Sequence, residues 1–190
     1  MTESKNETLM IVGKLVLISV VAAVLLGITY IPTSEQLERN VIAAQEAILR
    51  ELIPDAQNFD PIEGTGVVGE DGQREILYYR AVDSSGDIVG YAFFKEQQGS
   101  QGLIVVAGAV DASFTEVLGM NVLSHEETPG LGAKITTPAF QEQFIGVPLE
   151  QLGLSKSGGS IDAITGATIS SQAVVTALDT KIDQIETAEA

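Results

Sequence analysis

Residues 76–123, ILYYRAVDSSGDIVGYAFFKEQQGSQGLIVVAGAVDASFTEVLGMNVL, decide the fold. Four runs rich in β-branched and aromatic residues, 76–82, 88–94, 103–110 and 116–123, are separated by short segments rich in glycine, serine and aspartate. Runs of this length and spacing are typical of β-strands joined by tight turns. The stretch therefore predicts an antiparallel meander that forms the core sheet of one domain.

Helical patterns flank these strands in the sequence. Apolar residues recur at helical spacing across residues 37–52 and again across 174–185, as on one face of a helix. The first helix is expected to end at about Ile53, and a shorter helix is expected around Phe140 and Phe144. The predicted fold class is α+β, an antiparallel sheet flanked by helices.

Residues 54–74 connect the first helix to the strands. Pro54 and Pro61 interrupt any regular pattern, so an irregular, turn-rich connection is expected. The glycines that start at Gly64 have the G-x-G-x-x-G spacing of a dinucleotide-binding fingerprint. That motif needs a strand before it and a helix after it, and neither is indicated here. A flexible glycine loop is predicted.

Residues 9–31 form a long apolar run in which Lys14 is the only charged residue. At about 1.5 Å per residue, such a run spans the roughly 30 Å hydrocarbon core of a bilayer as a helix. A cleaved signal peptide is the alternative, but its apolar core is shorter and ends at small residues. Tyr30 and Ile31 are bulky, so a retained transmembrane anchor is expected.

The charges beside this run predict its orientation. Lys5 and Lys14 lie before or at the start of the run, whereas the segment beyond it is more acidic. By the positive-inside rule, residues 1–8 are expected in the cytoplasm. Residues 33–190 are then a domain on the outer or periplasmic face of a single-pass protein of the cell (inner) membrane.

Composition excludes several classes of function. The formal net charge of −16 argues against binding to nucleic acid or docking on an anionic membrane surface. Without cysteine, the chain has no disulfide, no thiolate-bound iron–sulfur cluster and no C-x-x-C-H haem attachment. A single histidine, His125, is too few for a typical structural zinc site. No intrinsic metal is predicted, so a redox role needs an organic cofactor.

Small and hydroxylated residues gather in a loop that leads into the last helix. The loop, residues 162–171, contains Thr165, Gly166, Ala167, Thr168, Ser170 and Ser171. A helix N-terminus offers free N–H groups and a favourable dipole, and hydroxyls add further ligands for a phosphate. Ser and Thr are also the commonest helix caps, so the residues alone leave simple capping open as an alternative.

The same loop resembles a known motif. Asp162-x-x-Thr165-Gly166-Ala167-Thr168-x-Ser170-Ser171 resembles the flavinylation motif of the FMN-binding domain in the RnfG and NqrC family. The resemblance implies that a flavin transferase joins the phosphate of FMN covalently to the Thr168 hydroxyl. It also assigns Asp162 as the leading acid of the motif.

A second segment, residues 125–134 with the sequence HEETPGLGAK, looks like the part of that family that packs near the flavin. From the residues alone, it reads as a turn with an ordinary surface or core histidine. The resemblance instead makes cofactor-binding candidates of His125, Glu127, Thr128, Leu131, Gly132 and Lys134.

The function that the resemblance implies is electron transfer in an Rnf-type complex, an ion-translocating ferredoxin:NAD oxidoreductase. The implied partners are other membrane subunits, and no catalytic acid, base or nucleophile is assigned. Because NqrC chains are typically longer, a length of 190 residues favours RnfG, with an NqrC-type component of a sodium-pumping quinone reductase as the alternative. Reversibly bound flavin and a cofactor-free interaction protein also remain open.

Overall fold

The structure is a computed structural model that describes residues 10–23, 43–64 and 74–190. The chain divides into two compact units, Met1–Glu46 and Ala47–Ala190. In the first unit, residues 10–23 of the expected anchor are helical. Residue 9 and residues 24–31 of that anchor lie outside the described residues. Within the described ranges, no helix combines the length and apolarity needed to cross a membrane.

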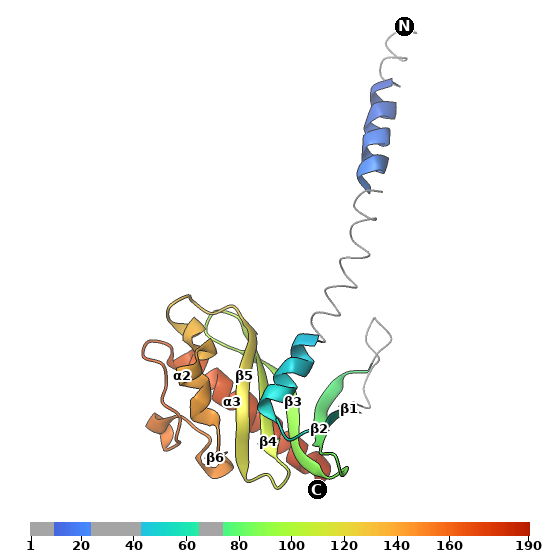
Figure 1. Cartoon of the computed structure of the whole chain (residues 1–190). Helices are drawn as coiled ribbons and strands as arrows, with labels where there is room; N and C mark the ends of the chain where they lie inside the picture. The colour runs from blue at the N-terminus through green and yellow to red at the C-terminus, as the bar shows by residue number, and fades with distance from the viewer. Residues whose placement is uncertain (1–9, 24–42, 65–73) are drawn as a thin grey trace. The chain divides into compact units, whose positions relative to one another are not determined.

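The second unit is built on a six-stranded antiparallel sheet in which neighbours in sequence are neighbours in space (Figure 1). Its strands are β1 (Asn58–Glu63), β2 (Ile76–Val82), β3 (Ile88–Gln98), β4 (Leu103–Asp111), β5 (Glu116–His125) and β6 (Val147–Pro148). The predicted meander and the α+β class are confirmed. Short turns join β2 to β3, β3 to β4 and β4 to β5. The turn between β3 and β4 closes with a 2.8 Å hydrogen bond from the Gly99 N–H to the Gly102 carbonyl.

The expectation of an irregular connection over residues 54–74 is wrong in part. β1 lies within it and pairs with β2, with Pro61 opposite Tyr79. Proline lacks an N–H group, but β1 is an edge strand and needs hydrogen bonds on one side only. The glycine loop predicted from Gly64 onward lies mostly outside the described residues.

Helices cover the two faces of the sheet. The last helix, α3 (Thr168–Glu189), packs on one face and contacts β3 and β4. Its predicted apolar stripe is buried: Val174, Val175, Leu178, Ile182 and Ile185. Each such side chain contributes about 1.5–3 kcal/mol when fully buried. Gly108 in β4 permits the close approach, because an added Cβ would overlap the Leu178 side chain of α3.

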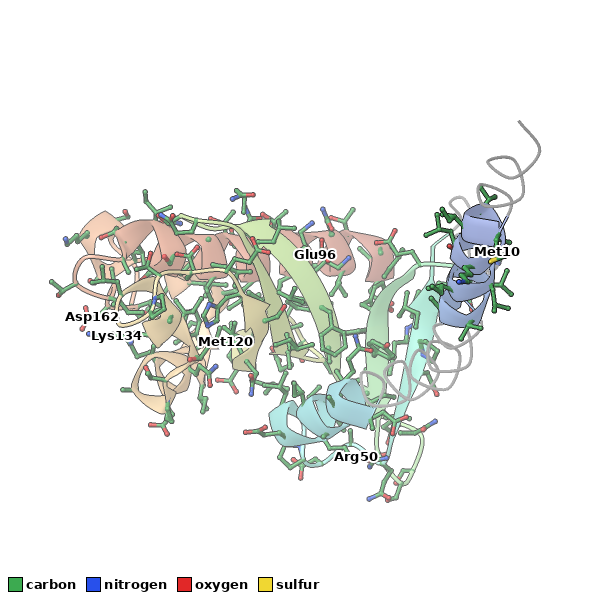
Figure 2. All side chains as sticks on the ribbon, turned by 90° about the horizontal axis from the view of Figure 1, so that it is seen from above. Met10, Arg50, Glu96, Met120, Lys134 and Asp162 are labelled. Carbon is green, nitrogen blue, oxygen red and sulfur yellow. The ribbon has the colours of Figure 1, made fainter. Side chains whose placement is uncertain are left out.

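The other face of the sheet is covered by the end of the first helix, around Leu49, Leu52 and Ile53 (Figure 2). This helix ends at Leu52, close to the predicted position. The sheet presents four alanines to it, which let the backbone approach: Ala81, Ala92, Ala107 and Ala109.

A series of short elements links β5 to α3. They are η1 (Gly132–Thr136), α2 (Pro138–Gln141), η2 (Glu142–Phe144), β6, η3 (Leu149–Gln151) and η4 (Ser155–Ser157). Phe140 and Phe144 of the predicted short helix are buried in the core. The fully buried Ile161 forms a parallel bridge with Leu154, so the loop before Thr168 is fixed to the body of the domain.

Candidate cofactor-binding site

α3 begins at Thr168, and its first turn has unpaired donors. The residue before it, Ala167, is the N-cap and makes no side-chain capping bond. The first α-helical hydrogen bond runs from the Ser171 N–H to the Ala167 carbonyl at 3.0 Å. The N–H groups of Thr168, Ile169 and Ser170 therefore have no partner within the helix. No loop hydroxyl therefore caps the N-terminus of α3.

Thr168 is exposed and lies where two cavities meet. The Glu127 cavity, of about 410 Å³, is bounded by the β3–β4 turn, the loop after β5 and the start of α3. The Lys156 cavity, of about 420 Å³, is bounded by the end of β3, η4 and one side of α3. Thr168 and Ile169 line both. Within the part of the chain that the structure describes, the Thr168 hydroxyl makes no hydrogen bond.

The Glu127 cavity brings together the two segments that the sequence singled out. Of the predicted cofactor residues, those that line it are Glu127, Thr128, Leu131, Gly132, Gly166, Ala167, Thr168 and Ser170. The volumes of both cavities lie in the range that small-molecule cofactors occupy.

The other predicted residues line neither cavity. Asp162 and Thr165 are exposed in the loop before α3, and Lys134 is exposed on η1. Figure 2 shows Lys134 and Asp162 at the same end of the domain. His125 accepts a hydrogen bond at Nδ1 from the Glu127 N–H at 3.1 Å. Ser171 is fully buried.

The two serines of the motif are already engaged within the protein. The Ser170 hydroxyl donates to the Glu127 carboxylate at 2.6 Å. The Ser171 hydroxyl donates to the Ala167 carbonyl at 3.0 Å and accepts from the Ile164 N–H at 3.1 Å. They therefore hold the loop and the helix start together, whereas Thr168 is exposed.

Glu127 is a buried carboxylate, with only 5% of its surface exposed. It accepts hydrogen bonds from the backbone N–H groups of Ser100 at 2.7 Å and Gln101 at 3.1 Å. Burial alone raises the pKa of Glu127, but the hydrogen bonds from Ser170 and from the β3–β4 turn outweigh it and hold the pKa below its ordinary value. The side chain is therefore ionised at neutral pH.

Two apolar side chains are exposed beside Thr168. Leu131 is 45% exposed and Ile169 is 64% exposed, and both line the Glu127 cavity. Gly166 has a φ of +81°, and an added Cβ would lie 3.3 Å from the Leu131 side chain. Exposed apolar groups around a cavity suit a flat aromatic ligand.

Sequence reasoning missed several lining residues. Ile169 was an unassigned position inside the motif, and Ser100 and Gln101 come from the β3–β4 turn, whose approach depends on the sheet. Lys156 lies in a segment with no recognisable motif. Among the described residues that line the two cavities, Glu127 and Lys156 are the charged ones.

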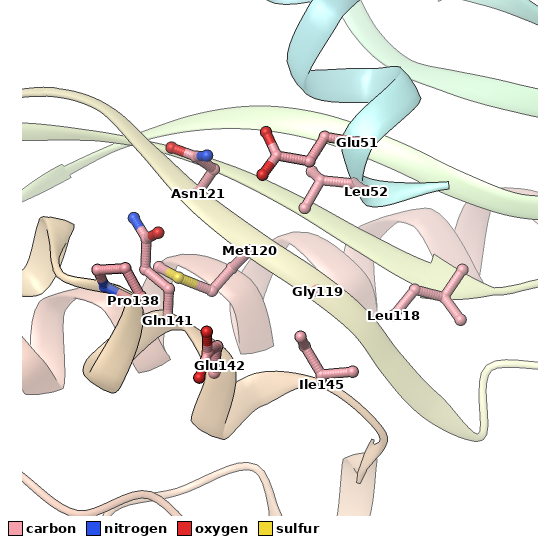
Figure 3. A pocket seen from close by; sticks show the side chains of 10 residues that line it. All are labelled: Glu51, Leu52, Leu118, Gly119, Met120, Asn121, Pro138, Gln141, Glu142 and Ile145. Carbon is pink, nitrogen blue, oxygen red and sulfur yellow. The ribbon is translucent and has the colours of Figure 1, made fainter. Parts of the chain in front are cut away.

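A third cavity lies elsewhere in the domain (Figure 3). It has a volume of about 260 Å³ and lies between the end of the first helix, β5 and the α2–η2 segment, with Met120 and Gln141 among its lining residues. None of the predicted cofactor residues lines it. Among the residues that the structure describes, no group of three or more His, Cys, Asp or Glu side chains is arranged to hold a metal ion.

The domain therefore has an exposed threonine at a helix N-terminus beside two cofactor-sized cavities, an arrangement suited to binding a phosphorylated cofactor. Residues 99–183 match the model of a family described as the FMN-binding domain. The matched range runs from the β3–β4 turn into α3. It includes Thr168, all residues that line the Glu127 cavity, and those that line the Lys156 cavity except Gln97 and Gln98.

The chain belongs to the RnfG family, the G subunits of ion-translocating oxidoreductase complexes. It is 46% identical over 189 residues to the G subunit of the ion-translocating oxidoreductase complex of Methanosarcina acetivorans, with 100% of both chains covered. It is 26% identical to the G subunit of the proton-translocating ferredoxin:NAD(+) oxidoreductase complex of Clostridium ljungdahlii, covering 97% of this chain and 95% of that protein.

Two further proteins are similar to the chain. The chain is 29% identical to the G subunit of the Na(+)-translocating ferredoxin:NAD(+) oxidoreductase complex of Acetobacterium woodii, with 88% of this chain and 86% of that protein covered. Among solved structures, NqrC of Shewanella oneidensis superimposes with a TM-score of 0.48 at 21% identity, covering 71% of this chain and 73% of that one. That score is too low to support an argument.

Proposed function

We propose that this chain is the FMN-carrying electron-transfer component of an Rnf-type membrane complex, an ion-translocating ferredoxin:NAD oxidoreductase. The relatives from C. ljungdahlii and A. woodii have that activity in their names, the first with protons and the second with Na⁺. Because the two names differ in the ion, the proposal assigns none to this chain. Electrons would pass between this chain and other membrane subunits of the complex.

The proposal also holds that FMN is joined covalently through its phosphate to Thr168. The observation that carries it is the position of Thr168, which is exposed, begins α3 and lines two cavities. The unpaired N–H groups of the first turn and the positive end of the helix dipole favour a phosphate there. Asp162 lines neither cavity, so its proposed role is in recognition by the flavin transferase.

The attachment needs an activated donor, because joining an alcohol directly to a phosphate monoester would require loss of water. The Thr168 oxygen forms the new P–O bond and gives up its proton to a base. A phosphoanhydride bond in a dinucleotide form of FMN breaks, and a nucleoside monophosphate leaves. The product is a phosphodiester with one negative charge, and Lys156 supplies a positive charge in an adjoining cavity.

When bound, FMN supplies one- and two-electron transfer. The residues of the chain would hold and surround it: Leu131 and Ile169 offer apolar surface to the ring and exclude water from it. A covalent tether keeps the ring at high effective concentration without a deep pocket. The proposal assigns no catalytic acid, base or nucleophile to the chain.

Residues 9–31 are proposed to be the membrane anchor, with residues 1–8 in the cytoplasm and the domain of residues 33–190 on the outer face. Every residue in the helical range 10–23 is exposed, although the range is almost wholly apolar. An apolar helix whose residues are all exposed needs another apolar environment, which a bilayer provides.

The orientation can be tested by cysteine labelling, because the natural chain has no cysteine. Ser4→Cys and Ser155→Cys each introduce a single thiol. A membrane-impermeant maleimide should label the Ser155→Cys variant in intact cells, and the Ser4→Cys variant only after lysis. The reverse pattern would show that the proposed orientation is wrong.

The covalent bond can be tested on the full chain purified from membranes of a host that has the flavin transferase. We expect fluorescence of the band after denaturing electrophoresis, and an FMN adduct on the peptide that contains Thr168. Thr168→Ala should abolish both. Thr180→Ala is the matched control, because it removes an exposed threonine of the same helix, outside the motif, and should retain the adduct. Wild-type protein that loses its flavin on denaturation would instead indicate reversible binding.

A further inference from the structure

We infer that Glu127 is a positioning residue, which fixes the first turn of α3, and with it Thr168, against the β3–β4 turn. This inference rests on the proposed function where it concerns the flavin. It differs from the role expected from the resemblance, in which Glu127 contacts the cofactor itself.

The contacts of Glu127 join two segments that are far apart in the sequence. Oε1 accepts hydrogen bonds from the N–H groups of Ser100 and Gln101, in the β3–β4 turn. Oε2 accepts from the Ser170 hydroxyl, in the first turn of α3. Each oxygen is therefore committed to a different segment, and the carboxylate bridges them.

The surroundings leave the carboxylate little freedom. An added Cβ at Gly132 would lie 2.8 Å from the Ser170 Oγ and would also overlap the Glu127 side chain. An added Cβ at Gly99 would lie 2.7 Å from the Ile104 side chain and would overlap the carboxylate as well. The two glycines thus leave the space that the Glu127 side chain fills.

The first turn of α3 depends on such a bridge. Thr168, Ile169 and Ser170 precede the first α-helical hydrogen bond, and the N-cap Ala167 adds no side-chain bond. The hydrogen bond from the Ser170 hydroxyl to Glu127 ties this turn to the domain and leaves its backbone N–H groups unpaired. A carboxylate near a helix N-terminus is also favoured by the helix dipole. Because Ser170 lies two residues after Thr168, the tie limits how far the Thr168 side chain can move.

The test compares Glu127→Gln with Glu189→Gln in the full chain expressed with the flavin transferase. Glu189 is a matched control, because its carboxylate ties the opposite end of the same helix to the sheet. Two measurements are made: hydrogen exchange of the backbone, and the fluorescence anisotropy of the attached flavin.

For Glu127→Gln we expect exchange at residues 171–174, the first amides with a partner in the helical pattern that begins at the Ala167 carbonyl, to rise about tenfold, and the flavin anisotropy to fall. For Glu189→Gln, faster exchange should be confined to the C-terminal end of α3 and the anisotropy should stay at the wild-type value. A merely structural role would lower stability in both variants without this difference in anisotropy. Ser170→Ala removes only the hydroxyl donor to Glu127, so it should raise exchange and lower the anisotropy by smaller amounts. If Glu127→Gln does not fold, the Ser170→Ala variant tests the inference in its place.

Unchanged exchange at residues 171–174 in both Glu127→Gln and Ser170→Ala would overturn the inference. Equal loss of anisotropy in the Glu127 and Glu189 variants would also overturn it. A wild-type chain without flavin would overturn the proposed function instead, and hydrogen exchange would still decide whether Glu127 holds the start of α3.

Discussion

The two ends of α3 are both tied to the domain by a carboxylate, but in opposite directions. At the C-terminal end, the helix supplies Glu189, which accepts two hydrogen bonds from Arg80, at 3.0 and 2.9 Å, and others from Tyr78 and Tyr91. At the N-terminal end, the helix supplies the Ser170 hydroxyl and the loop after β5 supplies the carboxylate.

The electrostatics of the two ends explain this reversal. A glutamate near a helix C-terminus is disfavoured by the dipole and needs a positive partner, which Arg80 provides. Burial, followed by the hydrogen bond to Glu189, raises the pKa of Tyr78 to about 12, so it remains a donor. At the N-terminus the dipole already favours the Glu127 carboxylate. The backbone N–H groups of Ser100 and Gln101 are therefore enough to stabilise its charge without a cation. The C-terminal end of α3 is therefore held by the ion pair between Arg80 and Glu189. The N-terminal end is held by Glu127 without a cation, and Thr168 stays exposed.

The largest effect is expected from breaking the C-terminal tie with Arg80→Ala. This change leaves the mostly buried Glu189 carboxylate without its charged partner, so we expect a loss of about 2 kcal/mol in the free energy of unfolding. Flavin attachment at Thr168 should persist. Urea unfolding and in-gel fluorescence measure the two quantities.

Arg74→Ala provides the control for that experiment. Arg74 pairs with Glu63 at 3.7 Å, but both side chains are more than half exposed, so its loss should cost no more than about 0.5 kcal/mol. Equal losses in the two arginine variants would mean that the C-terminal tie adds nothing beyond a surface ion pair.

A smaller effect is expected at the N-terminal end from Gly166→Ala. Gly166 has a φ of +81°, and the Cβ of an alanine there would lie 3.3 Å from the Leu131 side chain. We therefore expect a loss of about 1–2 kcal/mol in the free energy of unfolding. Because the strain lies two residues before Thr168, the yield of flavinylated protein should also fall. The yield is measured as the ratio of flavin absorbance to protein.

Gly158→Ala separates backbone strain from the change at the site. Gly158 has a φ of +91° and nothing within 4 Å of an added Cβ, so the backbone cost should be similar while flavinylation stays at the wild-type level. If Gly158→Ala lowers flavinylation as much as Gly166→Ala, the effect comes from general destabilisation and not from the site.

The sequence predicted the parts of the fold that follow a regular pattern. The four longer strands and α3 have apolar residues at the spacing of their secondary structure, and that spacing is sufficient. β1 was missed because it has only Phe59 and Ile62 as apolar positions around Pro61, and its pairing with β2 makes it a strand. β6 has two residues, too few for any pattern.

The candidate site was predicted only as two separate segments. The resemblance named both, but their meeting in one cavity depends on the turn between β3 and β4 and on the packing of α3. The roles of Ser170 and Glu127 could not be seen either, because a hydroxyl in a loop and a charged residue in a polar segment are usually exposed. Their burial and mutual hydrogen bond are properties of the tertiary structure.

The smallest effect is expected from pH, and it distinguishes the two ties by their charges. Burial raises the pKa of each carboxyl group, but hydrogen bonds outweigh it, so Glu127 and Glu189 both have a pKa below the ordinary value of 4.5. A lowered pKa in the folded state stabilises the fold fully above about pH 4.5, and this stabilisation is lost as the pH falls through the folded-state value. Urea midpoints of the wild type should therefore fall with acidification below that pH. Glu127→Gln and Glu189→Gln should each flatten the decrease, and the double variant should flatten it most; a decrease that is unchanged in the double variant would show that other carboxylates cause it.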